Sequence, residues 1–466
     1  MSDDTSKAEK LKEKLVFKKE STWKSIDKDK AFEFADRYKD FLDSAKTERE
    51  AFNYILERVE EKGYKNLEDV SKIESGDKFY AVNKKKQIVA AKIGENFDDV
   101  RVTLSHLDAP RLDLKQKSFY EANDLCIADT HYYGGIKKYQ WTNVPLAFHG
   151  TVVDSENNVH TFVVGEDEND PVFLVPDLLP HLGREQLKKK LKDAIEGEEL
   201  NILVGNIPID EEGAEEAVKL NILNYLNEKY GFVEEDMMSA EIEAVPATKS
   251  RDMGFDRSMV AAYGQDDRGH AFVSLESLFE SESDKTLMAC FFDKEEIGSE
   301  GNTSIKSGFL ERVASLLIEK SGEKVESGVH GFFNNVDALS MDVSAAVNPN
   351  HAEMHDAKNS LNLGQGVAFV KFTGAGGKYS ANDANAEFVG RVRKWFNDEE
   401  VPFHPVELGK VDKGGGGTVA KFLANRGSDV VDMGFPLLSM HSPYEIASKA
   451  DIYSTFKAGK AFYEGE

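Results

Sequence analysis

The sequence predicts an α/β protein: a mixed, mostly parallel sheet with helices on both faces, interrupted by an inserted β-rich domain. From residue 258 onward, strand-like and helical segments alternate, which is typical of helices that cover both faces of a sheet. Short apolar runs such as 286–292 have the pattern of strands buried in a parallel sheet. Between about 118 and 249 the sequence is instead β-rich and punctuated by turn residues. We therefore expect 1–117 and 250–466 to form one domain, with 118–249 inserted into it.

The chain begins with two predicted amphipathic helices. Apolar side chains recur at helical spacing in 28–44, and the second helix, 47–62, opens on Thr47-x-x-Glu50, a capping-box pattern. Gly63 follows the last apolar position, where a left-handed residue commonly ends a helix. Next come a predicted hairpin and a strand that enters the core, at 78–83, 87–94 and 99–106.

The remaining elements follow the same two patterns. In the insertion we expect strands at 144–153, 158–165 and 171–175, and a helix with Ala214, Val218, Ile222, Tyr225 and Leu226 on one face. In the last part we expect strands at 286–292, 336–343, 367–372 and 429–435, alternating with helices at about 268–280, 306–320, 383–398 and 417–426.

Composition excludes several classes of protein. The formal charge is −26, from 84 acidic and 58 basic residues, which disfavours binding to nucleic acid or to an anionic membrane surface. No run approaches the ~20 apolar residues of a membrane helix, and the N-terminal region lacks the apolar segment of a secretory signal. The only cysteines, Cys126 and Cys290, fit a reducing compartment, so we expect a cytoplasmic protein.

Polar residues follow the predicted strands at the points where ligands bind in open α/β sheets, their carboxyl ends. Singly, each has an ordinary explanation: Asp266 before a helix fits an N-cap, and a histidine after a strand is usually structural. Together, two histidines and three carboxylates suit a pair of zinc-like ions, with Asp266 as the bridge. The five residues are His106, Asp266, Glu296, Asp342 and His441.

The local spacings fit this chemistry. His106 and Asp108 lie two apart on an extended segment, so Asp108 can accept the second N–H of the imidazole. Glu295 and Glu296 are adjacent and point to opposite sides in extended backbone, so one can bind metal while the other acts as general base. Two ions held together polarise a carbonyl and lower the pKa of water, which predicts metal-assisted hydrolysis.

At these residues the sequence resembles the M18 family of metallo-aminopeptidases, which comprises aminopeptidase I and aspartyl aminopeptidase. The resemblance extends from about residue 20 to the C-terminus, and its motifs keep the family's order and spacing. The matching strings are SHLDAPRLDLK (105–115), GQDDR (264–268), DKEEIGSEG (293–301), MDVSAAVNPN (341–350) and MGFPLLSMHSPYE (433–445).

The resemblance implies a zinc-peptidase-like catalytic domain with two divalent ions per subunit. It places His106, Asp266 and Asp342 around one ion, and Asp266, Glu296 and His441 around the other. It also implies that Glu295 is the general base and that Asp108 supports a metal-binding histidine. Zinc suits this ligand set best, with Co²⁺ or Mn²⁺ as alternatives.

The resemblance further implies that 118–249 is a dimerisation domain and that the chain assembles into a dodecamer. His181 resembles an inserted-domain histidine that reaches a neighbouring subunit's active site, and Lys371 resembles a lysine near the substrate pocket. For both, a solvated side chain is an equally good account. The family string DMAHAVHPN reads DVSAAVNPN here, so the preferred N-terminal residue, acidic or neutral, stays open.

These inferences predict an aminopeptidase that hydrolyses the N-terminal residue from peptides with a free N-terminus. Two alternatives remain: a peptidase-like scaffold without activity, and an acyl-amino hydrolase or carboxypeptidase that uses the same two-metal site. The glycine run 414–418 fits either an anion-binding loop or flexible access to the pocket.

Overall fold

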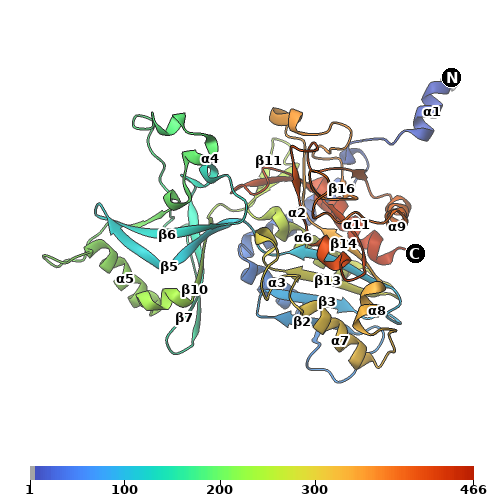
Figure 1. Ribbon diagram of the computed structural model, residues 1–466, viewed down its shortest axis with the longest axis horizontal. Helices are drawn as coiled ribbons and strands as arrows, with labels where there is room; N and C mark the ends of the chain where they lie inside the picture. The colour runs from blue at the N-terminus through green and yellow to red at the C-terminus, as the bar shows by residue number, and fades with distance from the viewer. Residues whose placement is uncertain (1–5) are drawn as a thin grey trace.

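The computed structural model describes residues 6–466, so positions 1–5 of the predicted first domain segment lie outside it. Figure 1 shows two parts of unequal size, a large sheet covered by helices on the right and a smaller β-rich part on the left. Among the helices of residues 6–466, none is both long and apolar enough to cross a membrane.

The larger part is built on a nine-stranded mixed sheet. Its strands, in spatial order, are β1 (Lys65–Asn66), β2 (Lys78–Asn83), β3 (Gln87–Lys92), β13 (Thr286–Phe292), β4 (Val100–His106), β14 (Val336–Met341), β20 (Asp429–Gly434), β16 (Val367–Val370) and β18 (Phe403–Pro405). The central strands β13, β4, β14 and β20 run parallel, whereas β2 with β3, β3 with β13 and β16 with β20 are antiparallel. Every residue of β4 and β13 is buried, because helices cover both faces of the sheet.

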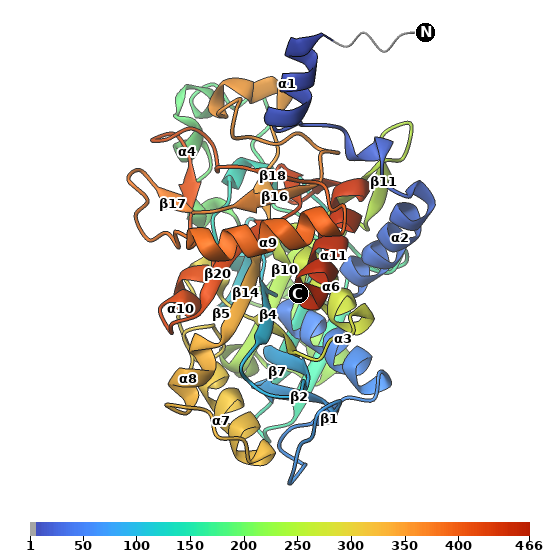
Figure 2. The same ribbon diagram turned by 90° about the vertical axis from the view of Figure 1, so that its right-hand side faces the viewer.

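One face of the sheet packs against α2 (Lys28–Ser44), α3 (Glu48–Glu61), α6 (Gln265–Glu280), α9 (Ala386–Asp398) and α11 (Lys449–Glu464). The other face packs against α7 (Phe309–Ser321), α8 (Val329–Asn334) and α10 (Ala420–Ala424). Figure 2 shows the two groups on either side of the central strands. The predicted fold class, a mixed and mostly parallel sheet between two helical layers, is confirmed.

The β-rich part is a six-stranded antiparallel sheet. Its strands, in spatial order, are β8 (Val159–Val164), β7 (Leu146–Val153), β10 (Ala240–Pro246), β5 (Arg111–Ala122), β6 (Leu125–Tyr133) and β9 (Ile202–Gly205). The helices α4 (Leu191–Ala194) and α5 (Ala217–Tyr230) belong to the same part. Strand β5 runs through position 118, where we predicted the insertion to begin. The strand predicted at 171–175 is wrong, because there only Phe173 and Leu174 make single bridges, to Leu146 and Leu203.

Two small sheets complete the larger part. One contains β11 (Arg251–Met253), β12 (Met259–Ala262), β22 (Glu445–Ser448), β21 (Pro436–Leu438) and β15 (Ser344–Ala345), and the other pairs β17 (Gly374–Ala375) with β19 (Gly415–Gly416). The β21–β22 pair is antiparallel, and its connecting loop carries His441. The N-terminal helix α1 (Lys7–Leu15) buries no residue and projects from the molecule in Figures 1 and 2.

Candidate metal centre

The carboxyl ends of three neighbouring strands deliver polar side chains to one place. His106 is the last residue of β4 and lies opposite Phe292, the last residue of β13. Asp342 directly follows β14, on the other side of β4. Glu295 and Glu296 lie on a 3-10 turn just after β13, in place of the extended backbone that we predicted for them. Both glutamates, together with His106 and Asp342, line the same cavity.

Asp266 and His441 reach this place from outside the large sheet. Asp266 lies in the first turn of α6, where its backbone is not helical, and the peptide bond to Asp267 is cis. Its N–H donates to Oε2 of Glu445 at 3.1 Å, and Oε1 of Glu445 accepts from the N–H of His441 at 2.8 Å. A single buried carboxylate therefore holds the backbones of both residues in place.

The side chain of Asp266 stands at the centre of the cluster. Its Oδ1 lies 3.4 Å from Nε2 of His106, and its Oδ2 lies 3.1 Å from Nε2 of His441. Nε2 of His441 is also 3.3 Å from Oε1 of Glu296. Two groups of donor atoms, each within 4.8 Å of one another, share Asp266: one adds His106 and Asp342, and the other adds Glu296 and His441. The structure thus brings together all five residues that we predicted as metal ligands.

Both imidazole rings present Nε2 to the cluster because Nδ1 is bonded elsewhere. Nδ1 of His106 lies 3.0 Å from the carbonyl oxygen of Asp108, and Nδ1 of His441 lies 2.7 Å from the carbonyl oxygen of Gly135. A carbonyl oxygen only accepts, so each Nδ1 carries the proton. With a cation bound, each ring would be neutral and would offer its Nε2 lone pair to the metal beside Asp266.

The charges of the cluster are unbalanced in the protein alone. Burial, and then the charge of Asp266, raise the pKa values of Glu296 and Asp342 well above the ordinary carboxyl range. Burial lowers the pKa of His441, but the carboxylates of Asp266 and Glu296 outweigh it and raise that pKa to about 11. Within residues 6–466, the buried Oε1 of Glu296 has no hydrogen-bond donor. These groups fit divalent cations, which would neutralise the carboxylates and take the free lone pairs.

Asp108 organises the turn that carries the two glutamates. Its Oδ1 accepts from the N–H of Glu295 and its Oδ2 from the N–H of Glu296, both at 3.1 Å. We predicted that its carboxylate accepts the second N–H of His106; Oδ1 lies 3.2 Å from that Nδ1, slightly farther than the backbone carbonyl. Burial raises the pKa of Glu295 to about 7, with smaller contributions from neighbouring carboxylates.

The cluster lies on the wall of a cavity of about 520 Å³. Apolar side chains such as Val370, Phe372 and Leu408 line it, together with Ser344 and the glycine run 414–417. Thr418, next to that run, donates its hydroxyl to Asp432 at 2.6 Å.

The structure places the two remaining candidate residues away from the metal-ligand cluster. Lys371 is paired with Asp383 at 2.6 Å, and Lys378, which lines the cavity, holds the other oxygen of Asp383 at 2.7 Å. His181 lies in an exposed turn of the β-rich part. Neither Lys371 nor His181 is among the residues that line the cavity.

Sequence reasoning missed several residues that hold the cluster in place. Glu445 ends one of the motif strings, four residues after His441, so an acidic residue at that spacing was a usable signal. Asp267 follows Asp266 and binds His270, with Oδ1 at 2.5 Å from Nδ1. Tyr133, which contacts Asp108, comes from β6, and nothing in the sequence pattern marks it.

The chain matches the family described as aminopeptidase I zinc metalloprotease (M18) over residues 41–463. A probable M18 family aminopeptidase 1 of Clostridium acetobutylicum is 46% identical over 438 residues, which cover 92% of this chain and 94% of that protein. The crystal structure of the M18 aminopeptidase of Thermotoga maritima shares 43% identity and a TM-score of 0.94, covering 97% of this chain and 100% of that one. The S. cerevisiae mApe1 dodecamer shares the fold at 21% identity, with a TM-score of 0.74 and coverage of 92% and 96%. The chain therefore belongs to the M18 family of zinc metallo-aminopeptidases, a family of hydrolases.

Proposed function

We propose that this chain binds two divalent ions, zinc by preference, and hydrolyses the N-terminal residue from peptides. One observation carries the proposal: Asp266 presents each of its two carboxylate oxygens to a different histidine, His106 and His441. This is the arrangement expected of a carboxylate that bridges two ions, with Asp342 and Glu296 as the outer ligands. Two ions held there would supply Lewis-acid chemistry, polarising the scissile carbonyl and lowering the pKa of water.

The residues of the chain perform the proton transfers in this proposal. Glu295 lines the cavity next to the proposed ligands, and its carboxylate accepts a proton from the attacking water. The water oxygen then bonds to the carbonyl carbon, the C–N bond breaks, and Glu295 gives the proton to the departing amine nitrogen. Asp108 orients Glu295 through the backbone of the turn. A base with a pKa near neutrality is well suited to exchange protons with water and an amine.

Metal removal and replacement test this function. Exhaustive treatment with a chelator should abolish hydrolysis of aminoacyl-p-nitroanilides, and zinc, cobalt or manganese should each restore activity, with two ions bound per chain. N-acetylated versions of the same substrates are the matched control, because an aminopeptidase needs the free amine. Full activity in metal-free protein would contradict the mechanism. Faster hydrolysis of the acetylated substrates would instead favour an acyl-amino hydrolase.

We also propose that Lys371 influences which N-terminal residue is accepted. Lys371 shares Asp383 with Lys378, and Lys378 lines the cavity, so a change at Lys371 alters the charge available to the substrate. Lys371→Met should change the ratio of activities on aspartyl and leucyl substrates, measured on protein loaded with one metal. An unchanged ratio would contradict this role.

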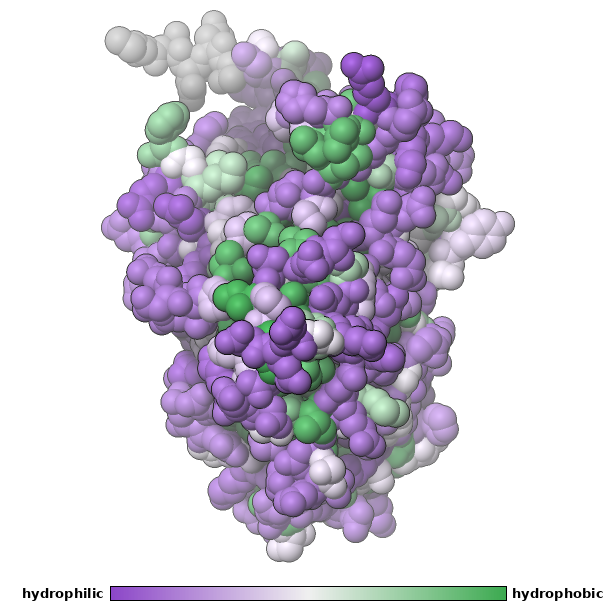
Figure 3. Space-filling model, turned by 90° about the vertical axis from the view of Figure 1, so that its left-hand side faces the viewer, coloured by the Kyte–Doolittle hydropathy of each residue, from purple (hydrophilic) through white to green (hydrophobic). Residues whose placement is uncertain are grey.

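We propose further that residues 118–249 form an oligomerisation domain, that the chain forms a dodecamer, and that His181 enters the active site of a neighbouring subunit. The exposed side chains around His181 support this, since Leu178 and Leu179 are each 47% exposed and Leu182 is 68% exposed. Figure 3 views the molecule from the side of the β-rich part and shows apolar patches among hydrophilic side chains. Exposed apolar groups of this kind mark contact surfaces. The shared fold with the mApe1 dodecamer is consistent with assembly.

Finally, we propose a cytoplasmic location for the protein. Cys126 and Cys290 are both free thiols and both buried, as expected of a protein kept in a reducing compartment. Fractionation of cells that express the protein, followed by detection with an antibody, would test this proposal.

A further inference from the structure

The β-rich part of the molecule contacts the candidate metal centre directly, through the end of strand β6 and the loop that follows it. The hydroxyl of Tyr133, the last residue of β6, donates to Oδ2 of Asp108 at 2.8 Å. Two residues later, the carbonyl oxygen of Gly135 accepts from Nδ1 of His441 at 2.7 Å. One contact supports the turn that carries both glutamates, and the other fixes the tautomer of a candidate ligand.

The backbone between these two contacts packs tightly against the cluster. A Cβ atom on Gly134 would lie 3.3 Å from Oε2 of Glu296, and Gly134 has a φ of +74°, which side chains rarely adopt. A Cβ atom on Gly135 would lie 3.4 Å from Nδ1 of His441. The loop therefore approaches Glu296 closely enough to require glycine at Gly134, whereas a Cβ atom on Gly135 would make an ordinary contact with His441.

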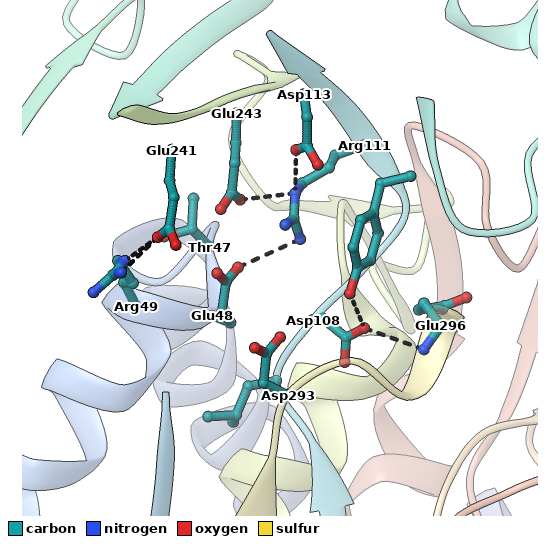
Figure 4. A network of polar contacts seen from close by, with 12 residues as sticks. Thr47, Glu48, Arg49, Asp108, Arg111, Asp113, Glu241, Glu243, Asp293 and Glu296 are labelled. Carbon is teal, nitrogen blue, oxygen red and sulfur yellow. Dashed lines mark hydrogen bonds and ion pairs between the residues drawn. The ribbon is translucent and has the colours of Figure 1, made fainter. Parts of the chain in front are cut away.

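Tyr133 is itself held rigidly from the other side. The guanidinium of Arg111 lies 4.0 Å from the centroid of the tyrosine ring. Figure 4 shows Arg111 among three carboxylates, which approach it at 2.7 Å (Asp113), 3.2 Å (Glu243) and 3.4 Å (Glu48). Glu48 begins α3 of the larger part, so this ion-pair network joins the two parts of the molecule beside the site.

The hydroxyl of Tyr133 acts as a donor toward Asp108. Burial, reinforced by the charge of Asp108, raises the pKa of Tyr133 far above its ordinary value, so the hydroxyl keeps its proton. Oδ2 of Asp108 then accepts from both Tyr133 and the N–H of Glu296, while Oδ1 accepts from the N–H of Glu295. Without the hydroxyl, the Asp108 carboxylate would lose one of the hydrogen bonds that fix its orientation. The turn that carries Glu295 and Glu296 would then be held less firmly.

We propose that Tyr133 and the loop at Gly135 are positioning elements of the metal centre, so that the inserted part completes the site in its own subunit. This inference rests on the proposed two-metal function, and it adds residues that do not touch the substrate or the ions. It also predicts that docking of the β-rich part and metal binding depend on each other, because each contact joins that part to the metal centre. Residues that orient metal ligands from behind typically change affinity or activity by about 10–100-fold.

The test compares Tyr133→Phe with Tyr132→Phe, its neighbour on the same strand, whose side chain is 41% exposed. Both changes remove a single oxygen atom. Metal-free proteins would be titrated with Co²⁺ against a chelating dye, and their visible absorption spectra and values of kcat and KM would be recorded. We expect Tyr133→Phe to bind Co²⁺ about 10–100-fold more weakly, with a changed cobalt spectrum and a lower kcat at similar KM. Tyr132→Phe should match the wild type.

A second variant protects the test against a folding defect. Gly134→Ala should weaken Co²⁺ binding, because its Cβ atom would crowd Glu296 at a φ of +74°, and a circular dichroism spectrum would verify that each variant is folded. If folded Tyr133→Phe and Gly134→Ala both match the wild type in cobalt affinity, spectrum and kcat, the inference is wrong. If the wild type itself binds no Co²⁺, the proposed metal site is wrong, and the inference is overturned with it.

Discussion

Glu295 and Glu296 are adjacent residues whose surroundings give them different chemistry. Glu296 lies 3.3 Å from a ring nitrogen of His441 and belongs to one group of candidate ligands. Glu295 belongs to neither group, although it lines the same cavity. A carboxylate that lies beside bound ions without binding them would be able to exchange protons with water. Of these two adjacent glutamates, Glu295 is therefore the candidate general base, because it lines the cavity but belongs to neither ligand group.

Replacement of Glu295, the proposed general base, should separate catalysis from metal binding. Glu295→Gln keeps the size of the side chain and removes its ability to accept a proton, so kcat should fall by about 10²–10⁴-fold. Metal content, measured by atomic absorption, should stay at the wild-type level, whereas Glu296→Gln should lose metal as well as activity. A Glu295→Gln enzyme that works at the wild-type rate would rule out this role.

We expect the acidic limb of the pH–rate profile to report the ionisation of Glu295, the proposed general base. In the proposed mechanism activity requires the carboxylate, so kcat/KM should rise with pH as Glu295 loses its proton. Without ions, burial raises the pKa of Glu295 to about 7, and nearby cations favour the charged form and shift it down. The limb should therefore lie below pH 7 in the metal-loaded enzyme and be absent in Glu295→Gln. A limb centred above pH 7 would contradict this assignment.

Stability of the metal-free protein should depend on pH with a definite sign. Burial raises the folded-state pKa of Glu445 to about 8 and that of Glu295 to about 7, against about 4.3 for glutamate in an unfolded chain. The stabilisation from these groups is complete below the unfolded value and is lost as pH rises through the folded values. The Tm difference between metal-loaded and metal-free protein should thus widen from pH 5 to pH 8, as measured by calorimetry. A constant difference would show that the cluster carries no uncompensated charge.

At the scale of single elements, α3 shows how a local sequence signal sets a helix end. The hydroxyl of Thr47 accepts from the N–H of Glu50 at 3.3 Å, and the Glu50 carboxylate accepts from the N–H of Thr47 at 3.0 Å, which confirms the predicted capping box. Gly63, with a φ of +78°, lies two residues beyond the last helical position. The same Glu50 carboxylate binds His149 of β7 at 2.6 Å, so this cap also joins the two parts of the molecule.

Removal of this cap should destabilise the protein by a modest amount. Thr47→Ala deletes the hydroxyl that accepts the Glu50 N–H, and the expected loss in the free energy of unfolding is about 1 kcal/mol. Thr47→Ser, which keeps the hydroxyl, is the matched control and should unfold close to the wild-type urea midpoint. Equal midpoints for Thr47→Ala and the wild type would show that the cap contributes nothing.

The sequence predicted the elements whose signals are local. The amphipathic helix at 28–44 and the buried strand at 286–292 agree with α2 and β13, because apolar periodicity and burial coincide there. The helix predicted at 417–426 is shorter, since α10 spans only Ala420–Ala424 after the glycine run. Residues 171–175 carry apolar side chains like those of a strand. Within the described residues, however, this segment makes only single bridges, at Phe173 and Leu174, and no continuous ladder with a neighbouring strand.

The sequence predicted the part of the candidate site that lies at the carboxyl ends of parallel strands. His106 and Asp342 end neighbouring parallel strands, and such ends meet at one edge of a sheet. Tyr133 and Gly135 were not predictable, because their contacts depend on how a separate sheet docks against the first. Docking between distant parts of the chain leaves no periodic sequence pattern, whereas the apolar run of a buried strand shows where that strand ends.

At the scale of the whole molecule, the charge of −26 and the exposed leucines of the insertion act in opposite directions on assembly. Like charges on identical subunits repel each other, and salt screens this repulsion over about 8 Å at physiological ionic strength. Burial of exposed apolar side chains favours association by about 25 cal/mol per Å². We therefore expect assembly to tighten as the salt concentration rises.

If His181 acts in a neighbouring subunit, its effect on activity should require assembly. Leu182, 68% exposed beside His181, provides the means to separate the two. Leu182→Glu adds charge to the proposed contact surface, so analytical ultracentrifugation should show smaller species and kcat/KM should fall. His181→Ala should lower kcat/KM in the assembled wild-type background and have no further effect in the Leu182→Glu background. Leu187→Glu, at an 80% exposed position farther along the insertion, tests whether any added charge has the same effect. An equal loss from His181→Ala in both backgrounds would place the histidine's role within its own subunit, and no loss in either would leave it as a solvated surface residue.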